Sequence, residues 1–161
     1  MSDVSIYLSL FDAAWGHAYE SLQDALKGVS EAEAAYQAPC YSTEAREEGW
    51  PEPGTIAWQV AHLIHCKRHY TEHFLRAASG QAVQETPWVP IESFADLCAA
   101  LENAHGLQRQ AIAALEPEWL ERIAGNGMTY HEFLAMVIRH DTWHASQIAV
   151  ARRGYRHRSE R

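Results

Sequence analysis

Cysteine is scarce in this chain: its 161 residues include only three, and no two are spaced as a CxxC pair. An odd number without such a pair argues against a disulfide framework and against a cysteine-based zinc site. We therefore expect Cys40, Cys66 and Cys98 to be reduced and to serve mostly in packing.

Long apolar runs are also missing. The longest uncharged stretch in the middle of the chain, Gly54 to Cys66, has 13 residues and contains two histidines, which makes it too short and too polar to cross a bilayer. Asp3 and Asp12 occupy the region where a secretory signal needs a basic segment and an apolar run. The sequence predicts a cytoplasmic protein with no membrane span.

Positive charge is in short supply, with a formal net charge of -8. Nucleic acid is therefore not an expected partner, because a basic surface drives phosphate binding. The last ten residues are the exception, since they hold five arginines and one glutamate. We expect residues 154–161 to form a solvated basic tail behind a single globular domain over residues 1–153.

Four segments have apolar residues at helical spacing, and no stretch alternates as a strand does. The fold class predicted is therefore all-α, a four-helix bundle with long connections whose neighbour order stays open. The first stripe includes Val4, Phe11 and Leu22, and the third includes Leu101 and Leu107. The helices are expected over Val4–Val29, Thr55–Ala78, Ser93 to a point before Pro117, and Thr129–Arg153.

Capping residues mark several of these ends. Ser93 with Asp96 and Thr129 with Glu132 have the spacing of residues that cap the start of a helix. Gly80 and Gly154 follow the second and fourth segments, where a glycine commonly ends a helix.

The fourth helix places His140 and His144 on one face together with Phe133, Val137 and Ile148. Two stacked core histidines would repel if protonated and would leave ring nitrogens unpaired if neutral. A shared metal ion resolves both problems, because imidazoles at i and i+4 project toward one point.

The second helix offers a third ligand from a row of four histidines: His62, His65, His69 and His73. His62 lies nearest the core-facing side, whereas His65 and His69 border the polar flank and are second choices. Cys66, one turn beyond His62, is placed to line the same pocket, although a buried cysteine is more often packing.

Three histidines, His62, His140 and His144, would leave a divalent metal with open positions for water or substrate. Gln147 is a candidate for orienting a ligand from the second layer. Asp141 points about 100° away from His140 around the helix, so we expect it on the surface or in helix pairing rather than as a general base.

Two motifs carry a family resemblance. Trp58 to Leu63, with His62 inside it, and His140 to Ile148 resemble the W-x-x-x-H-L and H-x-x-x-H-x-x-Q-I motifs of the DinB/YfiT-like family. The resemblance implies a four-helix bundle, often a homodimer, with one zinc or nickel ion held by His62, His140 and His144.

The family includes transferases that use bacillithiol or similar low-molecular-weight thiols, so the resemblance favours a thiol S-transferase acting on a small molecule. Tyr41, Trp50 and Trp88 are then candidates to roof the pocket. A metal-dependent hydrolase uses the same ligands but needs a carboxylate base. A bundle that binds a metal or small molecule without catalysis is the third alternative.

Overall fold

A computed structural model describes residues 3–38, 48–79, 88–124 and 127–158. Every helix in these ranges is too short or too polar to traverse a lipid bilayer. The chain is helical, as the sequence predicts, and the only β-type pairing in these ranges is an isolated bridge between Ile123 and Thr129. The α-helices are α1 (Asp3–Gly16), α2 (Leu22–Leu26), α3 (Glu31–Ala34), α4 (Ile56–Ser79), α5 (Phe94–Ala113) and α6 (Tyr130–Arg158).

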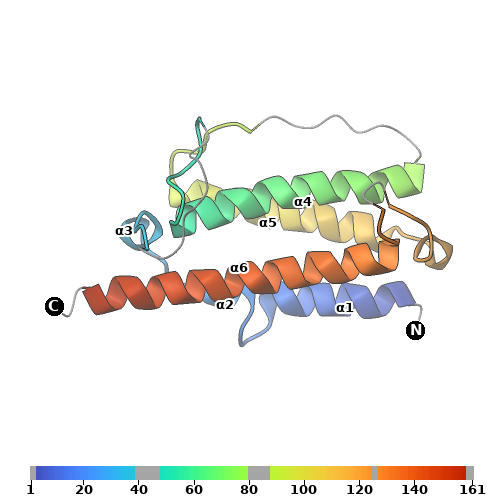
Figure 1. The fold of residues 1–161 in the computed structure, drawn as a ribbon, viewed down its shortest axis with the longest axis horizontal. Helices are drawn as coiled ribbons and strands as arrows, with labels where there is room; N and C mark the ends of the chain where they lie inside the picture. Colours follow the sequence, from blue (N-terminus) through green and yellow to red (C-terminus); the bar gives the residue numbers. More distant parts are fainter. Residues whose placement is uncertain (1–2, 39–47, 80–87, 125–126, 159–161) are drawn as a thin grey trace.

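Four rods make up the bundle: α4, α5, α6 and the line formed by α1 with α2 (Figure 1). The α4 and α5 helices pack most extensively and run parallel, whereas α6 runs antiparallel to α4 and covers both α1 and α2. The Tyr130 hydroxyl donates to the His73 carbonyl over 3.1 Å, which joins the start of α6 to the end of α4. The long connection between α4 and α5 permits this parallel pair.

The expected continuous helix over Val4–Val29 is wrong. The α1 helix ends at Gly16, and α2 starts after Ser21, whose hydroxyl accepts a hydrogen bond from the Asp24 amide. Between them, Glu20 adopts a left-handed φ of 60°. A serine cap and a left-handed residue both stop a helix from propagating, while the apolar spacing continues across the break.

The predicted caps of α5 and α6 are present. The Ser93 hydroxyl accepts from the Asp96 amide, and Thr129 and Glu132 each accept the other's backbone N–H. The expected end of the last helix at Arg153 is wrong, because α6 continues through Gly154 to Arg158. Gly80 lies outside the described residues.

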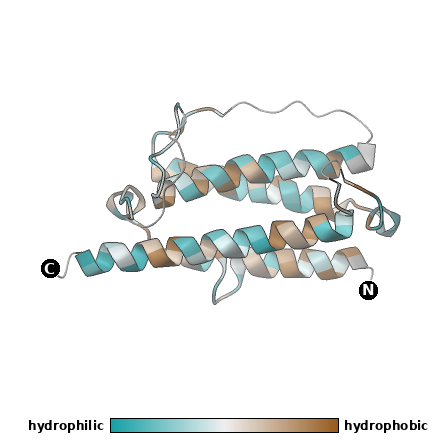
Figure 2. Cartoon of the chain, viewed as in Figure 1, coloured by the Kyte–Doolittle hydropathy of each residue, from teal (hydrophilic) through white to brown (hydrophobic). Residues whose placement is uncertain are grey.

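Buried apolar side chains from every rod form the core. Figure 2 shows apolar and polar residues alternating along the helices, with a hydrophilic end to α6. Leu107 departs from the predicted stripe, since it is 49% exposed. Arg152, the first of the five arginines in the last ten residues, is held against the bundle: its Nε donates to Glu33 Oε1 over 2.9 Å and its Nη1 to the Ala25 carbonyl.

His105 of α5 is a buried histidine to which the sequence assigns no role. Its ring stacks on Trp15 at 3.9 Å between centroids and on Phe11 at 4.6 Å. No hydrogen-bond partner for its Nδ1 occurs among the described residues. Burial, reinforced by the nearby Lys67 ammonium, lowers the pKa of His105 to about 3.

Replacing His105 by phenylalanine is expected to flatten the loss of stability in acid. The unfolded chain binds a proton here near pH 6.5, whereas the folded chain stays neutral down to about pH 3. The contribution of His105 is therefore complete above pH 6.5 and declines below it by about 1.4 kcal/mol per pH unit. Urea unfolding at about pH 7, 6 and 5 measures the slope. Parallel profiles for the two proteins would contradict this assignment.

Candidate metal centre

His140 and His144 approach each other on successive turns of α6. Their Nε2 atoms are 3.2 Å apart, and their ring centroids are 4.5 Å apart. Two nitrogens bound to one tetrahedral zinc at 2.0–2.1 Å would be separated by about 3.3 Å. The two imidazoles therefore have the spacing that a shared metal ion requires.

His62 of α4 faces this pair from across the helix interface. Its ring centroid lies 5.5 Å from that of His140 and 4.9 Å from that of His144. The ring also stacks on Trp58, with centroids 5.0 Å apart and planes 14° from parallel. The structure thus brings the three sequence-predicted histidines together.

Gln59 fixes the orientation of His144. Its Oε1 is hydrogen-bonded to His144 Nδ1, and both side chains are buried. Because an amide oxygen accepts, His144 Nδ1 carries the proton and Nε2 keeps its lone pair. The sequence suggested Gln147 for orienting a ligand from the second layer, whereas the side chain bonded to His144 Nδ1 is that of Gln59, three residues before His62 on α4.

Cys66 also lies at the site. Its Sγ is 3.4 Å from His62 Nε2. His62, Cys66 and His140 each offer one ligand atom, and these atoms lie within 4.8 Å of one another, a spacing that fits a divalent metal. Burial raises the pKa of the Cys66 thiol to about 11, although a hydrogen bond with Tyr70 opposes the rise. The thiol is therefore protonated at neutral pH unless a cation binds it.

The two histidines of α6 are held neutral. Burial and the Lys67 ammonium lower the pKa of His140 to about 4. Burial, together with the neighbouring imidazoles of His140 and His62, lowers the pKa of His144 to about 3. Neutral rings keep the lone pairs with which a metal is bound.

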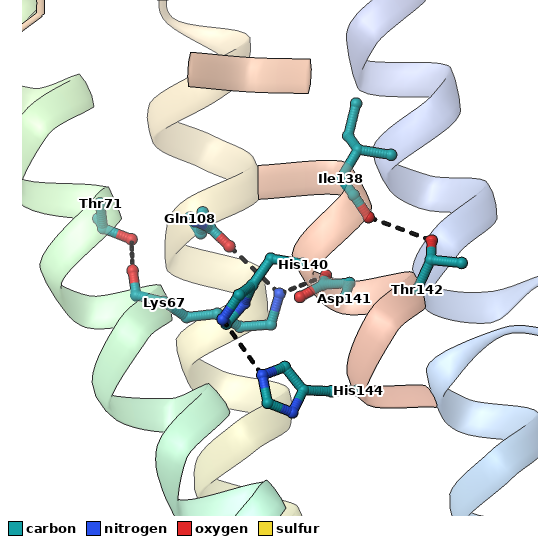
Figure 3. Close-up of polar contacts among 8 residues, drawn as sticks. All are labelled: Lys67, Thr71, Gln108, Ile138, His140, Asp141, Thr142 and His144. Atoms are coloured by element: carbon teal, nitrogen blue, oxygen red, sulfur yellow. Dashed lines mark hydrogen bonds and ion pairs between the residues drawn. The ribbon is translucent and has the colours of Figure 1, made fainter. Parts of the chain in front are cut away.

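Directly behind the imidazoles, a buried ion pair ties α4 to α6 (Figure 3). Lys67 Nζ lies 2.5 Å from Asp141 Oδ2, and both side chains are 1% exposed. The same ammonium donates to Gln108 Oε1 of α5 over 3.2 Å. The expectation of a surface position for Asp141 is wrong, whereas the alternative of helix pairing is confirmed.

The ion pair is strongly affected by its surroundings. Burial lowers the pKa of Lys67, and the adjacent Asp141 carboxylate opposes this effect. Burial likewise raises the pKa of Asp141, against the pull of the ammonium. Lys67 also lies over the Phe11 ring, 5.0 Å from its centroid, so three helices besides its own surround this charge.

The remaining histidines of α4 point elsewhere. His65 and His69 are exposed, as their place on the polar flank predicts. Trp50 contacts the His65 ring and packs against Trp88, with centroids 4.6 Å apart. Tyr41 and Cys40 lie outside the described residues.

A hollow of about 560 Å³ lies away from the imidazoles, between the end of α1 and the side of α5. Its walls include His17, Gln23, Cys98 and Glu102. None of the three clustered histidines lines it, so this hollow is separate from the candidate metal centre.

Comparison with known families places this fold and site in context. No curated protein matches the sequence. The model of the DinB superfamily matches residues 14–148, which include all of α4, α5 and the three clustered histidines. The chain belongs to the DinB superfamily.

Proposed function

We propose that the protein is a metal-dependent enzyme in which His62, His140 and His144 hold a divalent metal, zinc or nickel. The observation that carries the proposal is the convergence of three buried or half-buried imidazoles from two helices, with a 3.2 Å separation between two Nε2 atoms. Imidazole nitrogen suits both zinc and nickel. The donors present therefore fit the proposed metal.

The proposed reaction joins the sulfur of a low-molecular-weight thiol, of the bacillithiol type, to an electrophilic carbon of a small molecule. The carbon loses its leaving group, and the thiol loses its proton. A bound divalent metal would supply the positive charge that stabilises the thiolate at neutral pH. Membership of the superfamily supports this class of reaction and leaves the electrophile unnamed.

The residues of this chain have separate tasks in the proposal. His140 and His144 present neutral imidazoles, and Gln59 keeps the proton of His144 on Nδ1. The Trp58 ring limits rotation of His62 by stacking on it. These contacts orient ligands before a metal or thiol arrives.

Hydrolysis is less well supported, because it needs a carboxylate that can accept a proton from water. Asp141, adjacent to His140 in sequence, is buried and engaged by Lys67. A bundle that binds a metal without catalysis uses the same histidines, so activity must be measured directly.

The test is thiol consumption by the tag-free protein loaded with zinc or nickel, using bacillithiol, cysteine or glutathione with a chromogenic aryl halide. We expect metal-dependent turnover that falls to the uncatalysed rate in a His62→Ala/His140→Ala/His144→Ala variant. Cys66→Ser is the matched control and should keep both metal and turnover if Cys66 is not a ligand. Stoichiometric metal without turnover would instead favour the non-enzymatic alternative.

We also propose a homodimer, as the resemblance implies. Trp143 of α6 is 63% exposed, and Ile6 and Leu10 of the adjacent α1 are also exposed. Large exposed apolar side chains are typical of a surface that a second copy covers.

A further inference from the structure

A second imidazole pair lies farther along α4. His69 Nε2 and His73 Nε2 are 3.3 Å apart, and their ring centroids are 4.9 Å apart. This nitrogen separation nearly equals that of His140 and His144 and matches the distance of about 3.3 Å between two ligands of a tetrahedral ion. The four-residue spacing is the helical arrangement in which two histidines bind one metal.

The pair is separate from the candidate metal centre. Seven residues divide the middle of the His69–His73 pair from that of His62 and Cys66, which corresponds to about 10 Å along the helix. Tyr70 and Phe133 stand between the two groups: Tyr70 contacts Phe133 and His140, and Phe133 contacts His73. Two-metal active sites hold their ions about 4 Å apart, so an ion here would not form one.

The pair is both held in place and open to solvent. His69 is exposed, whereas His73 is half-buried against the Phe133 ring, 5.3 Å away between centroids. The backbone of His73 is tied to α6 through its carbonyl, which accepts from the Tyr130 hydroxyl. An ion can therefore reach one imidazole directly while the other has restricted movement.

We propose that His69 and His73 form a second, solvent-facing site for a divalent transition metal, with water completing the coordination. Imidazole nitrogens suit copper, nickel and zinc, and the general order of affinity places copper first. With two protein ligands, this site binds more weakly than one with three. The proposal uses none of the ligands of the proposed function and does not depend on it.

Equilibrium dialysis of the full, tag-free chain against Ni²⁺ alone tests the proposal. The wild type is expected to bind two equivalents, and His69→Ala/His73→Ala is expected to bind one. The His62→Ala/His140→Ala/His144→Ala variant should keep the weaker equivalent. His17→Ala removes an exposed histidine whose ring contacts Tyr19 and is the control for nonspecific binding. Far-ultraviolet circular dichroism confirms folding of each variant.

The outcomes separate the two sites. Unchanged nickel uptake in His69→Ala/His73→Ala would overturn this proposal and would mean that the two rings only share a hydrogen bond. Equal losses in His17→Ala and in the double variant would overturn it as well. If the triple variant alone loses an equivalent, the proposed inner site stands and the second site fails. If the double variant alone loses one, the reverse holds.

Discussion

Replacing Lys67 by methionine is expected to lower the free energy of unfolding by about 3–5 kcal/mol. Methionine fills similar space but leaves the Asp141 carboxylate buried without its cation and Gln108 Oε1 without its donor. An unpaired charge in a core is far more costly than a missing pair. Urea unfolding followed by circular dichroism measures the loss, provided that the transition is two-state.

A second substitution distinguishes the buried charge from simple loss of packing. Lys67→Met/Asp141→Leu removes both charges and should recover most of the stability lost in the single variant. Arg109→Met is the matched surface control, because its pair with Asp12 is 44% and 40% exposed and should contribute at most about 1 kcal/mol. Wild-type stability in Lys67→Met would contradict the buried pair.

Replacing His144 by alanine is expected to weaken zinc binding by roughly 100- to 1,000-fold. This factor corresponds to the part of the binding free energy that one ligand contributes in a typical zinc site. Gln59→Leu keeps every proposed ligand but removes the acceptor from His144 Nδ1. It should weaken binding by about 10- to 100-fold. Competition with a chromophoric chelator measures both constants.

The loss of zinc affinity should be larger in His144→Ala, which removes a ligand, than in Gln59→Leu, which removes only the hydrogen bond to that ligand. Gln147 is a half-buried glutamine one turn beyond His144 on α6, and Gln147→Leu is the control that should bind zinc as the wild type does. If His144→Ala binds normally while Cys66→Ser does not, the ligands are His62, Cys66 and His140 rather than the three histidines. Equal binding by all variants would refute a metal at this place.

Sequence reasoning worked best where local chemistry decides the structure. The caps at Ser93 and Thr129 depend on side chains only three residues apart, and both form as predicted. The meeting of His140 and His144 also follows from the repeat of one helix. The position of His62 opposite this pair depends on how α4 packs against α6. The helical period of α4 predicts on which side of that helix His62 lies, but it does not predict which helix this side contacts.

The buried ion pair was missed although the helical period contains it. Lys67 is four residues beyond Leu63 and seven before Phe74, and Asp141 is four beyond Val137 and seven before Ile148. Both charges therefore lie within apolar stripes. The spacing of these two residues predicts burial, but their residue types predict exposure, because lysine and aspartate are rarely buried unless paired. One such charge in a stripe is a signal to look for its opposite in another.

The sequence indicates the break between α1 and α2 less clearly than it indicates the buried ion pair. Apolar residues continue at helical intervals through Leu22 and Ala25 because α2 packs on α6 in line with α1. Periodicity reports which face is buried and not whether the backbone is continuous. Gly16 and Ser21 marked the end and the new start.

On two helices a candidate metal ligand is followed directly by a buried charged residue: Cys66 precedes Lys67 on α4, and His140 precedes Asp141 on α6. Inserting one residue ahead of either pair would turn both members by about 100° around the helix, so that the ligand takes the direction of the charge and the charge turns away by another 100°. The ligands would enter the core as the charges left it. Insertions and deletions should thus be far less tolerated in these two helices than in the connections between them. The salt bridge between Lys67 and Asp141 forms only when both helices keep their register.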